Sequence, residues 1–310
     1  MVHVVAVAGG QGDVGRTIVE KLDDESTIYV DYTNASHIRD SLEKYNVEVV
    51  ISCLNVICPE ASQAEVNLAR ACDSSSSTRR FIASQWSIKV AQGSPLPDFS
   101  AAVKRWVWPD WFAWPPMDQR SIAATLAVLS QTKLEYTVVS NGHFSDYYGY
   151  PIVKTYLKHA AFLVDIANKT TAIPGSGQDK IAFTYSFDVT RFVDALVNTK
   201  DKWPKHSVII GEKITANKIV AIAEDARGER FSVVHDDVNK LKSLQVTELP
   251  SHVEAYKFFP KPMLQTLLAA IGLWITEGHF NLAYEASLNQ MFPNIELTSV
   301  KELIDQAWKA

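Results

Sequence analysis

Three glycines near the start of the chain have the spacing of a phosphate-binding loop. Gly9, Gly12 and Gly15 lie between an apolar strand pattern, Val2 to Ala8, and an apolar helical pattern, Val14 to Leu22. In this setting glycines permit a tight turn, close approach to a pyrophosphate and close packing of helix on strand, while the helix N-terminus attracts the phosphates. We predict that a dinucleotide binds here, with a glycine turn that holds no ligand as the alternative. The residues assigned to this loop are Gly9, Gln11, Gly12, Asp13, Val14 and Gly15.

An acidic residue follows at about the separation at which such folds recognise a ribose. Asp31 lies 22 residues after Gly9, at the end of a predicted strand over Thr27–Val30. A carboxylate there accepts hydrogen bonds from the ribose hydroxyls of NAD and repels the 2′-phosphate of NADP. No Arg or Lys lies between Lys21 and Arg39, so no basic clamp for NADP is visible. The alternative is that Asp31 only opens the turn before the next helix, a position that Asp favours.

Polar and aromatic residues follow two later strands at their carboxyl ends, where open α/β sheets bind ligands. Ser84 and Trp86 follow a predicted strand at Arg80–Ala83, and Asn141 to Phe144 follow one at Tyr136–Ser140. An indole can stack on a flat substrate, and a histidine exchanges protons near neutral pH. A capped turn with a packed Trp, and a structural His, are the alternatives. We assign Leu54, Ser84 and Asn141 to the cofactor, and Trp86, His143, Phe144, Tyr147 and Tyr148 to the substrate.

Half of the eight tryptophans lie in one proline-rich stretch, Trp106 to Trp114. The stretch has neither a helical nor an alternating period, and it lies between two predicted strands whose ends face the ligand side. We interpret it as a rigid aromatic lid in which Trp111 and Trp114 stack on a flat substrate. Packing of the loop onto the core, a subunit contact and a membrane-surface contact are the alternatives.

The composition is that of an ordinary globular protein. Of 310 residues, 47% are hydrophobic and 21% charged, which argues against disorder, and a net charge of −5 without a basic run argues against a nucleic-acid surface. No secretory signal is visible, and the apolar run Leu267 to Ile275 is too short to cross a bilayer. We expect a soluble, cytoplasmic protein without a membrane partner. Cys53, Cys58 and Cys72 lack paired spacing, so we predict no disulfide and no metal site.

Strand and helix patterns alternate at the lengths of βαβ units, which predicts a parallel sheet. The strands expected are Val2–Ala8, Thr27–Val30, Val47–Ser52, Arg80–Ala83 and Tyr136–Ser140, and the helices between them are Val14–Leu22, Ser36–Tyr45, Pro59–Cys72 and Ser121–Ser130. Later signals are a turn at Pro174–Gly177, helices opened by Asp188 and Thr215, a strand at Ser207–Ile210 and a helix at Met263–Ile275.

This order of elements predicts an α/β fold, a Rossmann-type doubly wound parallel sheet with a smaller C-terminal substrate lobe. We assign residues 1–145 to the NAD(P)-binding domain, with the aromatic loop 95–116 inserted, and residues 146–310 to the partly interwoven substrate lobe.

Seven segments, taken in order, resemble the fungal NmrA-like proteins of the isoflavone-reductase type, within the atypical short-chain dehydrogenase/reductases. They are VAVAGGQGDVGRTIVE, VDYTNAS, VISCLN, RFIASQWS, LEYTVVSNGHFSDYYG, IPGSGQDKIAFTYSFDVTRFV and VTELPSHVEAYKFFPK. The resemblance implies a Rossmann domain with a smaller substrate lobe, an NADP-type cofactor, and small aromatic, phenolic or secondary-metabolite substrates.

The chain departs from the pattern of this family on the adenosine side. Family members usually have a further helix, a strand and a basic loop before the VDY segment, and that loop grips the 2′-phosphate. Here the VDY segment follows the first helix almost at once, as if some two dozen residues were absent. We expect the strand at Thr27–Val30 to take the place of the second Rossmann strand, with Asp31 at the ribose. The cofactor is thus NADP by the resemblance, and NAD by Asp31 and the missing basic loop.

A second departure concerns the proton donor. Reducing members usually carry a Lys on the helix before the LEYTVVSNG strand, but the helix Ser121–Ser130 contains none. The nearest cation is Arg120, a poor general acid because a guanidinium stays protonated. The catalytic candidates are therefore His143, Tyr148 and Arg120.

Three classes of function fit these patterns. We favour an NAD(P)-dependent oxidoreductase that acts on an aromatic or polycyclic metabolite, as a monomer or homodimer. The missing Lys also fits a cofactor-binding but non-reducing enzyme of fungal secondary metabolism, such as a cyclase, isomerase or dehydratase. It fits equally an NmrA-type redox sensor that binds a protein partner.

Overall fold

The computed structural model of the chain describes residues 3–22, 26–54, 56, 59–88, 119–159, 161–257 and 260–309. The lid predicted at 95–116, with Trp111 and Trp114, lies outside the described residues, as does Cys58. Among the residues described, Cys53 and Cys72 are free thiols, and no helix is long and apolar enough to span a membrane.

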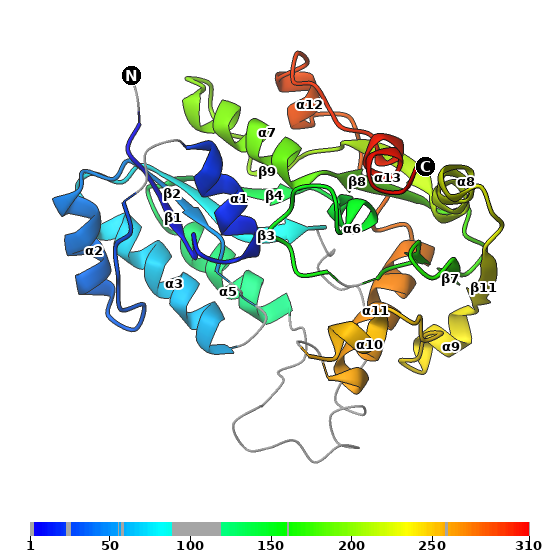
Figure 1. Cartoon of the computed structure of the whole chain (residues 1–310). Helices are drawn as coiled ribbons and strands as arrows, with labels where there is room; N and C mark the ends of the chain where they lie inside the picture. The colour runs from blue at the N-terminus through cyan, green and yellow to red at the C-terminus, as the bar shows by residue number, and fades with distance from the viewer. Residues whose placement is uncertain are drawn as a thin grey trace.

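A five-stranded parallel sheet forms the larger part of the molecule (Figure 1). Its strands lie in the order β1-β2-β3-β4-β9, with each neighbouring pair parallel. Their bounds are Val5–Ala8, Val49–Ser52, Arg80–Ser87, Glu135–Ser140 and His206–Val208. Strand β2 is buried at every position, as a parallel strand covered on both faces is, whereas β1, which carries the apolar run, is mostly half-buried. The predicted Rossmann-type α/β fold is confirmed.

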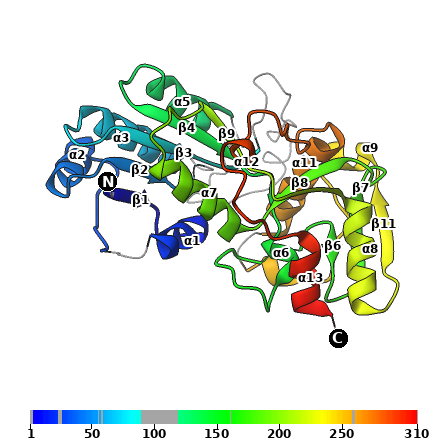
Figure 2. The same ribbon diagram turned by 90° about the horizontal axis from the view of Figure 1, so that it is seen from above.

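Helices cover both faces of this sheet (Figure 2). On one face α1 (Asp13–Lys21) packs against α7 (Ser186–Asn198), and side chains of both join the core under the strands. On the other face lie α2 (Ala35–Lys44), α3 (Pro59–Ser74) and α5 (Gln119–Leu129). The chain therefore crosses from one face to the other between α1 and α2.

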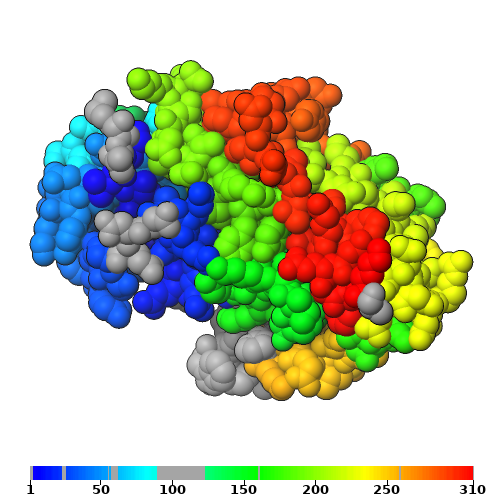
Figure 3. Space-filling model, turned by 45° about the horizontal axis from the view of Figure 1, so that its top comes forward, coloured from blue at the N-terminus to red at the C-terminus, as the bar shows by residue number. Residues whose placement is uncertain are grey.

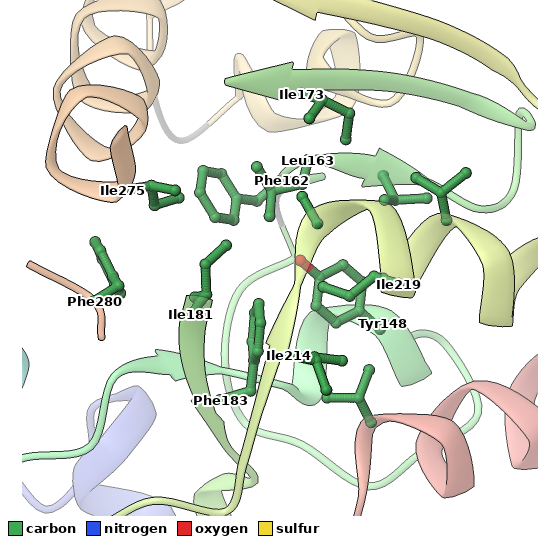
Figure 4. Close-up of a cluster of buried hydrophobic side chains, with 14 of the residues drawn as sticks. Tyr148, Phe162, Leu163, Ile173, Ile181, Phe183, Ile214, Ile219, Ile275 and Phe280 are labelled. Carbon is green, nitrogen blue, oxygen red and sulfur yellow. The ribbon is translucent and has the colours of Figure 1, made fainter. Parts of the chain in front are cut away.

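The smaller lobe contains two three-stranded sheets. One has the order β10-β8-β5 (Glu212–Thr215, Lys180–Thr184, His143–Phe144), and the other β11-β7-β6 (Ser232–Asp236, Thr170–Pro174, Val164–Asp165). The helices of this lobe are α6 Asp146–Gly149, α8 Ala216–Arg227, α9 Val238–Lys242, α10 His252–Ala255, α11 Lys261–Thr276 and α13 Val300–Trp308, whereas α12 Leu288–Met291 packs against β9 of the large sheet. Buried Tyr148, Phe183 and Ile219 lie together in its core (Figure 4).

Local sequence signals correctly predicted where several helices lie along the chain. Thr215 caps α8 by accepting a hydrogen bond from the Lys218 N–H at 3.2 Å, as predicted for a helix opened by this residue. Asp188 lies in the first turn of α7, and α11 spans the apolar helix predicted at Met263–Ile275.

The strand predicted at Thr27–Val30 is wrong. Residues 26–31 form no regular element, and β1 is the outermost strand of the large sheet among the described residues. The segment links α1 on one face with α2 on the other, so it passes the outer edge of β1 without pairing with it. Tyr29 is 83% exposed, so the β-prone residues that suggested a strand pack against no sheet here.

Candidate functional site

The glycine loop between β1 and α1 is built for close backbone contacts. Gly9 has a φ of +76°, and a Cβ atom there would lie 2.8 Å from the Cys53 carbonyl oxygen. A Cβ at Gly15 would lie 2.2 Å from the Gly9 carbonyl oxygen, so the helix meets the loop at a distance only glycine allows. The Gly12 N–H donates to the Gly9 carbonyl at 2.9 Å and closes the turn.

The N-terminus of α1 is open toward the same side as this loop. Gly12 is the N-cap residue, and the N–H groups of the first helical turn have no acceptor within the helix. Gln11 and Gly12 are exposed, and Asp13 and Val14 are half-buried. These residues fit a diphosphate bound at a helix N-terminus.

Ser84 and Trp86 line the carboxyl ends of β2 and β3. The Ser84 hydroxyl donates to the Leu54 carbonyl at 2.7 Å, and the Trp86 indole N–H donates to the Ser52 carbonyl at 3.0 Å. These bonds hold the end of β3 against the end of β2, and Trp86 packs with the apolar cluster of α1 and α7. Among the residues predicted to bind, Ser84, Leu54 and Trp86 are thus brought together beside the glycine loop.

A buried carboxyl group lies behind this wall. Glu65 of α3 is 1% exposed and accepts a hydrogen bond from the Ser84 N–H at 2.7 Å. The hydroxyls of Ser52 and Thr125 lie near this carboxyl group, although neither forms a hydrogen bond of ordinary geometry. Burial raises the pKa of Glu65 above its usual value, and the Ser84 N–H and these hydroxyls oppose the rise.

The sequence analysis missed Glu65, although a signal for its burial exists. It shares one face of α3 with Ala69 and Cys72, four and seven residues further on, and both are fully buried. A lone carboxylate on an apolar helical face is typical of a buried acid with a specific partner.

Asn141 directly follows β4 and carries a side-chain amide without hydrogen-bond partners among the described residues. The residue is fully buried, and neither Nδ2 nor Oδ1 has a hydrogen-bond partner among the described residues. Its backbone carbonyl accepts the Thr184 hydroxyl at 2.8 Å, which fixes the residue in place. A buried amide without partners is costly, so the Asn141 side chain is a candidate to hydrogen-bond a ligand.

His143 and its neighbours form an aromatic wall after β4. The ring of His143 lies 4.4 Å from that of Phe162 and 5.3 Å from that of Tyr147, centroid to centroid. Its Nε2 atom is buried without a partner among the described residues, and burial lowers the pKa of His143 to about 3. Phe144 is buried in the same apolar cluster as Trp86 and Tyr147. At neutral pH His143 is therefore an uncharged imidazole.

Tyr148 points into the core of the smaller lobe (Figure 4). It is 1% exposed, its hydroxyl has no partner among the described residues, and burial raises its pKa. This geometry weighs against Tyr148 as a proton donor, a role that stays a prediction. The side chain of the third candidate, Arg120 of α5, is outside the description.

Asp31 lies in the turn before α2. Its carboxylate accepts the Thr33 N–H at 2.9 Å and the Thr33 hydroxyl at 2.7 Å, and these bonds lower its pKa. Asn34 then caps α2 by accepting the His37 N–H at 3.0 Å. The geometry favours the turn-opening alternative for Asp31, and its ribose contact stays a prediction.

A segment of the smaller lobe crosses α1 next to the loop (Figure 3). Lys154 and Tyr156 both bond to the Glu20 carboxylate, the latter at 2.7 Å, and the Arg16 guanidinium lies 4.4 Å from the centre of the Tyr156 ring. We call residues 154–158 the strap. Its charges pair only when the two lobes meet, so no local sequence pattern indicates it.

The smaller lobe also encloses a cavity of about 20 Å³, lined in part by Leu249 and His252. Both ring nitrogens of His252 are hydrogen-bonded, to the Leu249 N–H and the Ala161 carbonyl. The space is enough for one water and not for a substrate. No group of three or more His, Cys, Asp or Glu among the described residues is placed to hold a metal ion.

No protein-family model matches the chain. Two curated relatives align over nearly its whole length. Oxidoreductase swnN of Metarhizium robertsii is 24% identical over 335 aligned residues, which cover 98% of this chain and 97% of that protein. Oxidoreductase BOA1 of Botryotinia fuckeliana is 28% identical over 316, covering 94% and 95%. The swnN alignment is longer than this chain of 310 residues, so swnN has residues without a counterpart here.

Solved structures match the fold as a whole. The ternary complex of leucoanthocyanidin reductase from Vitis vinifera has a TM-score of 0.72 at 14% identity and covers 98% of both chains. Isoflavone reductase has a TM-score of 0.69 at 14% identity, covering 99% of both. The structure of AtPrR2 with NADP+ and (+)pinoresinol has a TM-score of 0.69 at 15% identity, covering 98% of both.

The chain thus has the architecture of the isoflavone-reductase-like proteins, and its full-length curated relatives are fungal oxidoreductases. The resemblance predicted from the sequence is confirmed: the chain is similar over nearly its whole length to fungal proteins named oxidoreductases, and it has the fold of solved reductases.

Proposed function

We propose that this chain is an NAD(P)-dependent reductase of an aromatic or polycyclic metabolite. The observation that carries the proposal is the unpartnered, buried amide of Asn141 on the same sheet edge as the glycine loop. Strands β1 and β4 are three strand spacings apart, about 14 Å. An extended nicotinamide nucleotide bridges such a span, with its diphosphate at α1 and its carboxamide at Asn141. The reductase complexes with a nicotinamide coenzyme among the fold relatives support this placement.

The chemistry that the coenzyme supplies when bound is hydride donation at the nicotinamide ring. The residues of this chain orient the coenzyme and shield the reacting atoms from water. Asn141 donates and accepts through its amide, Trp86 offers an indole face, and the hydrogen bonds of Ser84 to Leu54 and Glu65 fix the wall between them. Apolar packing around these groups keeps water from the reacting carbon.

The substrate class follows from the wall of aromatic rings. Trp86, Tyr147 and the uncharged ring of His143 present flat faces and few charges, which suits a flat, apolar substrate with a carbonyl or enone group. The AtPrR2 structure, which has the same fold, contains (+)pinoresinol, an aromatic ligand.

The proposal is tested by turnover with a panel of aromatic ketones, quinones and enones. We expect reduced coenzyme to be consumed in step with product for at least one of them. Binding of the coenzyme without consumption for any compound would instead support the second candidate, a cofactor-binding enzyme that does not reduce. That candidate is favoured by a specific observation on both described candidate donors, whose polar atoms are buried: burial lowers the pKa of His143 so that it carries no extra proton, and raises the pKa of Tyr148 so that its phenol is a weaker acid.

A further inference from the structure

The outer edge of β1 is open on the side where a doubly wound sheet places its adenosine half. In such sheets the dinucleotide spans the point where strand order reverses, and the strands beyond the first one carry the adenosine. Here the described sheet runs from β1 in one direction only, through β2, β3, β4 and β9. Residues 26–31 pass this edge as an irregular segment.

The polar groups at this edge already form hydrogen bonds with neighbouring residues of the chain. The Asp31 carboxylate is held by Thr33, and the Asp31 N–H donates to His37 Nδ1 at 3.3 Å. The Tyr32 ring is half-buried against the apolar cluster that contains Ala8, and its hydroxyl lies near the Gly9 backbone. Burial raises the pKa of this hydroxyl, and the Gly9 backbone lowers it. Tyr32 thus lies beside the glycine loop, where the adenosine side would begin.

The cations of the neighbouring helix are also occupied. Arg39 bonds to Asp40 through Nε at 2.9 Å and Nη2 at 2.6 Å, and Lys44 lies over the Tyr45 ring at 5.1 Å. A 2′-phosphate is bound through charge-assisted hydrogen bonds from such groups. The described residues from 26 to 45 present Arg39 and Lys44 only in these pairings.

By comparison, groups suited to bind the diphosphate and the nicotinamide are present. The glycine loop has the close approaches that phosphate binding needs, and Asn141 holds its amide without a partner among the described residues. The groups suited to bind a coenzyme therefore lie at the glycine loop and at Asn141, and not at the outer edge of β1.

We propose that this chain binds the nicotinamide and diphosphate half of a nicotinamide coenzyme and does not recognise the adenosine 2′-phosphate. The reason is that, at the open edge of β1, Asp31 and Tyr32 interact with neighbouring residues of the chain. This inference rests on the proposed function and adds the specificity of its coenzyme site. NADH and NADPH bind with similar affinity, and reduced nicotinamide mononucleotide, which lacks the adenosine and one of the two phosphates, binds within about tenfold of them.

The test is calorimetric titration of the full chain with NADH, NADPH and reduced nicotinamide mononucleotide. We expect the Kd values of NADH and NADPH to agree within about threefold and that of the mononucleotide to lie within about tenfold of them. Adenosine 2′,5′-bisphosphate, which carries only the other half, should not displace NADH. An Arg-clamped phosphate would give NADPH an advantage of about 100-fold or displacement by the bisphosphate, and either result overturns the inference.

Two variants at one position sharpen this test. Asp31→Asn keeps an acceptor for Thr33, and Asp31→Lys places a cation at the edge of β1. We expect the ratio of the NADH and NADPH Kd values to stay within about threefold in both. A shift of about tenfold toward NADPH in Asp31→Lys would place the ribose phosphate at this residue and contradict the inference. If neither dinucleotide nor the mononucleotide binds the unaltered chain, the proposed function fails as well, whereas selective binding of NADPH overturns the inference alone.

Discussion

Two buried asparagines of this chain, Asn141 and Asn289, differ in how their side-chain amides are paired. Asn289 accepts the Ile210 N–H through Oδ1 and donates to the Ile210 carbonyl through Nδ2, both at 2.9 Å. Asn141 has no partner for either atom among the described residues. The first amide stabilises the fold, and the second is a cost that ligand binding would offset.

Replacing each asparagine by leucine separates these roles. We expect Asn141→Leu to leave the free energy of unfolding unchanged or to raise it by about 1 kcal/mol, because an unsatisfied buried amide is removed. The control, Asn289→Leu, should lower it by about 2 kcal/mol, because the Ile210 groups lose their partners. Urea unfolding measures both. Loss of NADH binding in Asn141→Leu alone completes the expected pattern, and a clear destabilisation of that variant would show that its amide is paired.

Glu65 makes stability depend on pH. Its pKa is raised by burial from a usual value of 4.5, so the folded state holds a proton that the unfolded chain loses first. Stability is therefore full below about pH 4.5 and falls as pH rises toward the raised pKa, by at most about 1.4 kcal/mol per pH unit.

Glu65→Gln keeps an acceptor for the Ser84 N–H and cannot ionise. We expect thermal melting between pH 4 and pH 8 to show a flatter pH dependence in this variant, with the difference from the parent largest at the alkaline end. Equal pH profiles for the two proteins would mean that the pKa of Glu65 is the same in the folded and the unfolded chain.

At the scale of elements, the contact between β1 and α1 depends on one glycine. A Cβ at Gly15 meets the backbone of Gly9 and Gly10, whereas a Cβ at Gly12 would come no closer than 3.2 Å to the Gly9 carbonyl oxygen. We expect Gly15→Ala to lower the free energy of unfolding by about 1–3 kcal/mol, as overpacking does, and Gly12→Ala to lower it by less. Denaturant unfolding compares the two. Equal effects would mean that α1 shifts freely on the sheet.

Elements with their own periodicity and caps were predictable from the sequence, and the elements around the adenosine edge were not. The apolar residues of β2 and β4 indicated strands, and Thr215 indicated the start of α8. The strand predicted at Thr27–Val30 failed because these residues find no partner strand. Whether a strand finds a partner strand depends on the whole sheet, and a short stretch of sequence does not show it.

The candidate site was predictable to the same degree. Gly9, Gly15, Ser84 and Asn141 follow strands whose ends meet at one edge, so the sequence order placed them together. Glu65 and the strap were not predicted, because their roles depend on contacts between segments remote in sequence, such as Tyr156 with Glu20. The interior position of Tyr148 also depends on how the smaller lobe packs.

At the scale of the whole molecule, the two lobes contact each other beside the carboxyl ends of the large sheet. The larger sheet supplies the glycine loop and the wall of Ser84 and Trp86, and β5 and α6, which follow β4, supply His143 and Tyr147. The strap ties the smaller lobe to α1, the helix that receives the diphosphate in the proposed function. In the proposed function the coenzyme and the smaller lobe therefore contact the same helix.

The central claim is that a reduced nicotinamide coenzyme binds across the strand ends between the glycine loop and Asn141. The most direct measurement is a calorimetric titration of NADH into the parent chain and into Asn141→Leu, with Asn289→Leu as the folded control. We predict saturable binding at one site per chain for the parent and the control, and loss of about tenfold or more in affinity for Asn141→Leu. Absence of binding to the parent, or equal affinity in all three, would contradict the account.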